Sequence, residues 1–262
     1  MIDIKPRESV PRKRRSPFGL AFHKLSSPPY FYLLAGKLAP WAGWLFAAFF
    51  LYSLYGGLVL APTDYEQGQS YRIIYIHVPS AWLSMLVYAS LAVASGISLI
   101  WRLKLAETVA RACAPIGASY TFLALVTGSI WGKPMWGTWW VWDARLTSEL
   151  ILLFLYLGYM ALQSAIEDRR TASRSSAILA LVGIVNLPII HYSVEWWNTL
   201  HQGASILKLD TPSIHSSMLF PLLTMVLAFH LHFLATVLMR IRCEILEDEQ
   251  RTHWVKKLTT KS

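Results

Sequence analysis

Cysteine and charged residues are scarce in this chain, and two common binding motifs are missing from it. The 262 residues include two cysteines, Cys113 and Cys243, and no C-x-x-C-H motif. Neither a disulfide framework nor a thioether-linked prosthetic group is therefore expected. No G-x-x-x-x-G-K-[ST] loop occurs, which excludes nucleotide binding by that route. Only 15% of the residues are charged, fewer than an ordinary soluble domain has.

Long apolar stretches are abundant instead. Hydrophobic residues make up 55% of the chain, and the mean hydropathy is +0.40. A helix needs roughly 20 apolar residues to cross a bilayer, and six stretches come near that length: 41–61, 78–101, 112–131, 150–166, 176–190 and 216–239. The fifth is short and must continue into His191 to cross. We therefore predict an all-α integral membrane protein with six transmembrane helices and, because the first stretch is itself long enough to span, no cleavable signal peptide.

Lysine and arginine are distributed unevenly between the two sides of these six spans. Twenty of the 24 lie before the first span, after the second, after the fourth or after the last. The other four lie in the opposite loops: Arg72, Lys133, Arg145 and Lys208. Basic residues in short loops mark the cytoplasmic side, so both termini are predicted to be cytoplasmic. This topology and anionic lipid account for the net charge of +9 without nucleic acid.

This topology predicts three parts of the chain. Residues 1–40 form a basic cytoplasmic arm with little structure of its own, which contains the PRKRR run at 11–15. Residues 41–240 form the six-helix transmembrane domain, and residues 241–262 form a cytoplasmic tail. The loops on the opposite, outer side are 62–77, 132–149 and 191–215.

Tryptophan is concentrated on the outer side, in and around the segment 131–149. The chain has 12 tryptophans, and eight are predicted at or near that face: Trp82, Trp131, Trp136, Trp139, Trp140, Trp142, Trp196 and Trp197. If residues 136–143 are helical, Trp136, Trp139, Trp140 and Asp143 share one face and Trp142 lies off it. Such an aromatic shelf would suit a large planar ligand. An interfacial belt or a helix-packing role stays open as the alternative.

Two histidines are predicted at the same depth as this shelf. His77 precedes the second span and His191 follows the fifth, so two imidazoles on different helices could face one another across a haem iron. The alternative is two unrelated interfacial histidines. His201 is interpreted as a solvated loop residue. His230 and His232 lie inside the sixth span, but side chains two positions apart on a helix point about 200° from each other, so they cannot hold one metal together.

Charged residues flank the shelf at the start of the fourth span. Asp143 could accept hydrogen bonds from indole or imidazole N–H groups, and Arg145 could pair with a haem propionate. Arg72, Lys133 and Lys208 are the competing outer cations. Glu149 is explained by the dipole at a helix N-terminus.

The segment WGTWWVWD at 136–143 resembles the tryptophan-rich WWD signature of haem-handling membrane proteins. Together with YRIIYIHVPSAW and GIVNLPIIHYSVEWWNTLHQG it resembles the cytochrome c maturation protein C (CcmC) family, over roughly residues 30–240. The resemblance implies a multi-pass protein of the bacterial inner membrane that holds haem b at the periplasmic face. The family's ligand histidines map onto His77 and His191, and its WWD positions map onto Trp136, Gly137, Trp139, Trp140, Trp142 and Asp143.

The resemblance also implies a role and partners. The family helps to load haem onto the chaperone CcmE and works beside CcmA, CcmB and CcmD, without catalysis of its own. Two rival interpretations remain at this point. A b-type electron-transfer subunit would bury haem between histidines such as His230 and one on a facing span, and no facing histidine is available at that depth. A permease subunit would use its tryptophans only as a belt.

Overall fold

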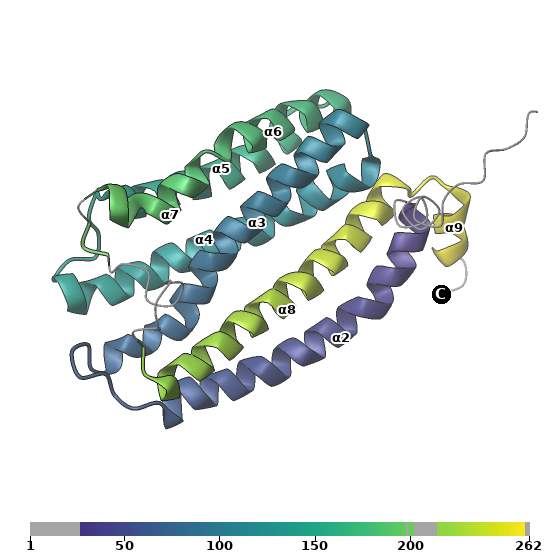
Figure 1. The fold of residues 1–262 in the computed structure, drawn as a ribbon. Helices are drawn as coiled ribbons and strands as arrows, with labels where there is room; N and C mark the ends of the chain where they lie inside the picture. The colour runs from purple at the N-terminus through teal and green to yellow at the C-terminus, as the bar shows by residue number, and fades with distance from the viewer. Residues whose placement is uncertain (1–26, 198, 202–213, 260–262) are drawn as a thin grey trace, which may run out of the picture.

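A computed structural model describes residues 27–197, 199–201 and 214–259 of the chain, and all of its long elements are helices (Figure 1). In chain order they are α2 (Pro28–Tyr55), the π-helical turn η1 (Gly56–Leu60), the 3-10 helix η2 (Gln69–Ile73), α3 (Ile74–Trp101), α4 (Lys104–Trp136), α5 (Ala144–Ala165), α6 (Arg169–Gly183), α7 (Asn186–Trp196), α8 (Ser216–Asp248) and α9 (His253–Thr259). Six helical stretches in the described residues are long and apolar enough to cross a membrane. The predicted number of spans is therefore confirmed.

The helices form a bundle in which α2 lies along α8, and α3 lies along α4 (Figure 1). Helices α5, α6 and α7 lie together on the other side of α3 and α4. Close approach depends on glycine, because a Cβ atom on Gly117 would lie 2.1 Å from the Tyr156 hydroxyl and one on Gly183 would lie 2.1 Å from the Tyr88 hydroxyl. Small residues permit such packing between membrane helices.

The helices extend beyond the apolar stretches that predicted them. Helix α2 starts at Pro28, so residues 28–40 are helical and do not belong to an arm without structure. Helix α8 continues to Asp248 and α9 follows, so the predicted tail is also largely helical. Hydropathy marks the part of a helix that lies in hydrocarbon, whereas a helix ends where its capping and packing end. The PRKRR run lies outside the described residues.

The fifth span, residues 169–196, is broken in the middle. Helix α6 ends at Gly183 and α7 begins at Asn186. Pro188 has no N–H to donate to the carbonyl of Ile184, four residues earlier, so the helical ladder is interrupted there. This break sets the direction of α7, which borders the site described below.

An ion-pair network joins the helices at the end of the bundle that contains the start of α4. Arg111 of α4 pairs with Glu107 at 3.1 Å, with Glu244 of α8 at 3.0 Å, and with Asp248. Asp248 also pairs with Arg169 at the start of α6. The Arg111 side chain is only 12% exposed. The network therefore connects α4, α6 and α8 at one end of the bundle.

Candidate functional site

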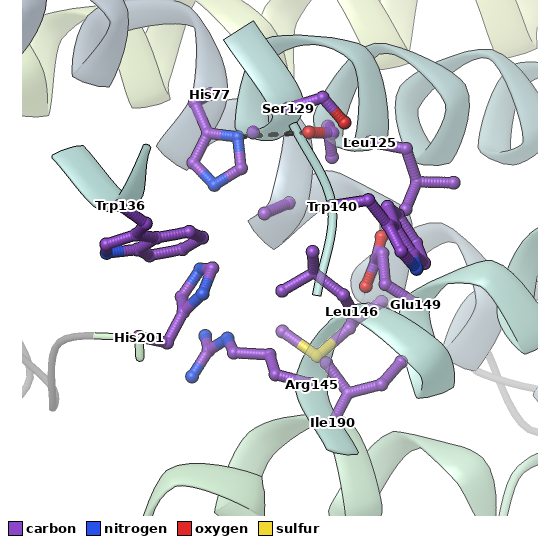
Figure 2. Close-up of a pocket in the computed structure, with 14 residues that line it drawn as sticks. His77, Leu125, Ser129, Trp136, Trp140, Arg145, Leu146, Glu149, Ile190 and His201 are labelled. Atoms are coloured by element: carbon purple, nitrogen blue, oxygen red, sulfur yellow. Dashed lines mark hydrogen bonds between the residues drawn. The ribbon is translucent and has the colours of Figure 1, made fainter. Parts of the chain in front are cut away.

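A pocket lies between α3, α4, α5 and α7 (Figure 2), beside the tryptophan-rich segment that joins α4 to α5. Its polar and aromatic lining residues are His77, Ser129, Trp136, Trp140, Arg145, Glu149 and His201. Its apolar and small lining residues are Ala81, Met85, Ala124, Leu125, Gly128, Leu146 and Ile190. Residues from distant parts of the chain therefore meet at one place.

His77 lies in the first turn of α3, and residues of α4 fix the orientation of its ring. Its Nδ1 is 3.1 Å from the carbonyl oxygen of Ala124 and 3.1 Å from Oγ1 of Thr127. A carbonyl only accepts, so Nδ1 carries the proton and donates it. The neutral ring then has its lone pair on Nε2, and Figure 2 shows that nitrogen directed into the pocket. A backbone carbonyl that holds the far nitrogen is the usual support for a metal-binding imidazole.

His201 faces His77 across the pocket. The two ring centroids are 6.4 Å apart, and the Trp136 ring lies 5.3 Å from His201. The backbone N–H of His201 donates to Oγ1 of Thr199 at 2.8 Å. Burial, together with the charge of nearby Arg145, lowers the pKa of His201 to about 3. Its imidazole is therefore neutral at physiological pH and has a lone pair for a ligand.

The separation of these two rings is compatible with a shared metal ion. A metal–imidazole bond is about 2 Å long, and the ligating nitrogen lies about 1 Å from the centre of its ring. Two imidazoles on opposite sides of one ion therefore have centroids roughly 6 Å apart, close to the 6.4 Å observed. The donors fit a metal that accepts two nitrogen ligands, such as haem iron.

The WWD segment is not helical, so the predicted shelf is wrong in its geometry. Helix α4 ends at Trp136 because Gly137 adopts a left-handed conformation, with φ of 75°, which glycine tolerates best. Helix α5 begins only at Ala144, where the Asp143 carboxylate accepts from the N–H of Leu146 at 2.8 Å. Both residue types are ordinary helix end signals.

The tryptophans of this segment therefore divide into two groups. Trp136 and Trp140 line the pocket. Trp139 is 56% exposed and Trp142 is 76% exposed, so both face outward. The Trp142 ring contacts that of Trp140 at a centroid distance of 5.4 Å. The segment thus presents one aromatic pair inward and one outward.

Three lining residues of the pocket have a buried polar atom without a hydrogen-bond partner among the described residues: Trp140 Nε1, Glu149 Oε1 and His201 Nδ1. Buried polar atoms are nearly always paired in folded proteins. Arg145 likewise forms no hydrogen bond or ion pair with the part of the chain that the structure describes. Figure 2 shows its guanidinium beside the His201 ring. These groups indicate a polar, charged partner that the described residues do not supply.

Comparison with known proteins identifies the family. The family model described as heme exporter protein C matches residues 21–256. The chain belongs to the heme exporter protein C family. Proteins of that name are 54% identical over 239 residues in Escherichia coli K12, covering 91% of this chain and 96% of that protein, and 51% identical over 236 residues in Haemophilus influenzae, covering 90% and 96%. One from Paracoccus denitrificans is 41% identical over 227 residues, covering 86% and 94%.

Membership of the heme exporter protein C family places the chain among multi-span membrane proteins of haem export and cytochrome c biogenesis. This is a family of haem transport and handling and is not known for enzymes. The family resemblance that the WWD segment indicated is thereby confirmed.

The structure does not bring His191 to the pocket that His77 lines. His191 is exposed, and its nearest ring is that of Tyr192, with centroids 4.7 Å apart. Its neighbour Ile190 is the residue of α7 that lines the pocket. Successive side chains on a helix point about 100° apart. His191 is therefore at the predicted depth, but its side chain points away from the pocket that Ile190 lines.

His201 is the residue that sequence reasoning missed, since it was interpreted as a solvated loop position. The sequence does place it in the same outer loop as His191, and this was the available signal. Of the competing outer cations, Lys133 donates to the carbonyl of Gly137 and lies 5.9 Å from the Trp139 ring. Arg72 donates to the carbonyls of Gly57 and Ala61. Lys208 lies outside the described residues, so Arg145 is the described cation at the pocket.

Proposed function

We propose that this chain binds haem b in the pocket between His77 and His201 and presents it to the haem chaperone CcmE during cytochrome c maturation. In this proposal the pocket is at the periplasmic face of the bacterial inner membrane, both termini are cytoplasmic, and the chain acts with CcmA, CcmB and CcmD. The observation that carries the proposal is the position of two neutral imidazoles, those of His77 and His201, with their ring centroids 6.4 Å apart. The family and the distribution of 20 of 24 basic residues support the partners and the orientation.

Each pocket residue has a distinct role in this proposal. Nε2 of His77 and the imidazole of His201 supply the two axial iron ligands. Trp136 and Trp140 provide aromatic surface for the porphyrin, and the guanidinium of Arg145 forms a charge-assisted pair with a propionate. With both axial positions held by the protein, the site stores haem and does not activate oxygen.

The outward tryptophans extend the same site toward the acceptor. Trp139 and Trp142 are exposed beside the pocket, and exposed tryptophan is enriched where proteins bind one another. In the proposal they contact the chaperone and the uncovered edge of the haem. Asp143 and Gly137 position this aromatic pair, because they end the two helices that flank the segment.

Haem binding requires the pocket to open. The cavity holds about 50 Å³, whereas pockets for ligands of moderate size are about 300–1,000 Å³. His77 lies on a helix and is hydrogen-bonded from behind, but His201 lies outside the helices, in the segment Thr199–His201. We therefore assign the opening to a displacement of His201 and the adjacent Trp136 ring, with His77 as the fixed ligand. Departure of His201 is then also the step that releases haem.

The visible spectrum of the purified protein tests this assignment. The wild type, co-expressed with its partners, is expected to show low-spin haem, and His77→Ala and His201→Ala are each expected to shift or abolish that spectrum. His191→Ala is the matched control, since His191 is an exposed histidine on the same side of the bundle and is expected to leave the spectrum unchanged. Loss of haem in His191→Ala with retention in His201→Ala would refute the ligand pair. Absence of haem in the wild type would favour the permease interpretation.

A further inference from the structure

The two histidines of α8 differ in what their nitrogens contact. His230 uses both: Nδ1 is 2.7 Å from the carbonyl oxygen of Val226, and Nε2 accepts from Nε1 of Trp82 at 3.3 Å. His232 uses one, since Nδ1 is 2.6 Å from the Tyr120 hydroxyl and Nε2 has no hydrogen-bond partner among the described residues. His230 is therefore closed to a ligand and His232 is open to one.

His232 lines a groove of about 340 Å³ between the first half of α4 and the second half of α8. The other lining residues are Pro115, Ile116, Ser119, Tyr120, Thr236, Met239 and Arg240. This groove is distinct from the pocket at His77, whose lining residues on α4 begin at Ala124 and continue toward the end of that helix. Its volume is within the range of small-molecule sites. Ionisable side chains within membrane spans are costly and usually functional, so an oriented histidine here requires an explanation.

Tyr120 makes His232 suitable as a metal ligand. The Tyr120 hydroxyl has a second acceptor, the carbonyl oxygen of Phe229 at 3.3 Å. When it donates its proton there, Nδ1 of His232 can carry a proton and donate it to the hydroxyl oxygen. The lone pair on Nε2 is then available in the groove. The arrangement parallels that of His77, in which an acceptor behind the ring holds Nδ1 and directs Nε2 into a cavity.

Arg240 supplies a cation to the same groove. It lies eight residues after His232, about 12 Å along the helix axis, in the half of α8 that contains the ion-pair network. Its side chain is 46% exposed and lies 3.6 Å from Glu244. Glu244 is already held by Arg111 at the shorter distance of 3.0 Å. The guanidinium of Arg240 is therefore accessible to an additional carboxylate.

We propose that this groove is a second haem-binding site, with Nε2 of His232 as its single protein ligand and Arg240 as the partner of a propionate. The proposal rests on haem handling by the chain but not on the His77–His201 ligand pair. A phospholipid is the competing occupant, because it could use the apolar walls and Arg240. The structure favours haem because a phospholipid would leave the oriented imidazole without a function. Haem bound here lies in the opposite half of the bundle from the WWD segment and has one free axial position.

Titration of the detergent-purified, haem-free protein with hemin tests the proposal. The wild type is expected to bind two equivalents and His232→Ala one equivalent, with the low-spin spectrum retained. The double variant His77→Ala/His201→Ala is expected to bind one equivalent with a high-spin, five-coordinate spectrum. Adding His232→Ala to that double variant should weaken the remaining binding at least tenfold, and free imidazole should partly restore it. His230→Ala is the matched control and should change neither stoichiometry nor spectrum.

Two further variants separate the possible failures. Tyr120→Phe keeps the ring and removes the hydroxyl, so it should weaken binding in the double variant about tenfold, as removal of an outer hydrogen-bond partner does elsewhere. Binding of one equivalent by the wild type, or high-spin binding indifferent to His232→Ala, would overturn the second site. A phospholipid retained by the wild type and lost in Arg240→Ala, with no hemin binding in the double variant, would assign the groove to lipid. A wild-type low-spin spectrum indifferent to His77 and His201 would instead overturn the first site.

Discussion

One methyl group at Gly128 tests whether the orientation of His77 controls haem binding. A Cβ atom added at Gly128 would lie 3.0 Å from Cε1 and 3.5 Å from Nδ1 of His77. Ordinary contact begins at 3.4 Å, so the ring must move by at least 0.4 Å, the difference between 3.4 and 3.0 Å. The ring is held at Nδ1 by the carbonyl of Ala124, and the movement therefore distorts that hydrogen bond and redirects Nε2.

The expected effect of Gly128→Ala is on haem and not on folding. Alanine is about 1 kcal/mol more favourable than glycine inside a helix, so the substitution does not weaken α4 by itself. Disturbing an outer partner of a metal-bound histidine typically costs 10- to 100-fold in affinity, which corresponds to about 1.4–2.8 kcal/mol. We expect a weakening of this size in a hemin titration of detergent-purified protein, with a shifted Soret band.

Gly43→Ala is the matched control for this prediction. Gly43 also lies within a helix, α2, but an added Cβ there meets nothing within 4 Å. It should leave both the affinity and the spectrum unchanged. If Gly128→Ala binds hemin like the wild type while circular dichroism confirms an intact fold, the inference that Ala124 and Gly128 orient the ligand is refuted.

Three further predictions concern packing and helix ends. Arg111→Leu leaves several carboxylates without their shared partner and should destabilise the protein by about 3 kcal/mol. Arg169→Leu removes a side chain that is 61% exposed and should cost less than about 1 kcal/mol. Equal shifts of the thermal midpoint in the two variants would contradict the importance of burial. Gly183→Ala places a methyl group against the Tyr88 hydroxyl and should cost about 1–3 kcal/mol or more; an unchanged midpoint would contradict the close packing of α3 and α6. Asp143→Ala should accelerate amide exchange in the first turn of α5 and cost about 1 kcal/mol of stability. Asp143→Asn should do neither, because asparagine also caps helices. Equal effects of the two substitutions would argue against a capping role.

The number of spans was predictable because it depends on a local property. The six stretches are as long as the hydrocarbon layer requires or, like the short fifth one, come near that length, and the transfer of a helix into the bilayer depends mainly on its own composition. The ends were less predictable, as Pro28 shows, because the ends of helices lie outside the hydrocarbon layer. The WWD segment lies between these two cases: Gly137 and Asp143 are local end signals that oppose a helix, but the spacing of the tryptophans had favoured one.

The composition of the site was visible in the sequence, and its arrangement was not. His77, Trp136, Trp140 and Arg145 were all predicted as site residues and all line the pocket. The second histidine that lines the pocket was not predicted, because depth in the membrane follows from position along a span, whereas direction depends on rotation of the helix against its neighbours. The break before Pro188 and the packing of α7 turn His191 outward, and the chain beyond α7 brings His201 back over Trp136.

The sequence by itself therefore determined a six-span, haem-handling membrane protein with an aromatic segment, since hydropathy, basic residues and a contiguous motif are all properties of short stretches. Only the tertiary structure decided which imidazoles oppose one another, which tryptophans face inward, and that His232 is open while His230 is closed. These outcomes depend on contacts between residues as far apart as His77 and His201, or Tyr120 and His232. Such contacts are set by how helices pack, and packing is a property of the whole bundle.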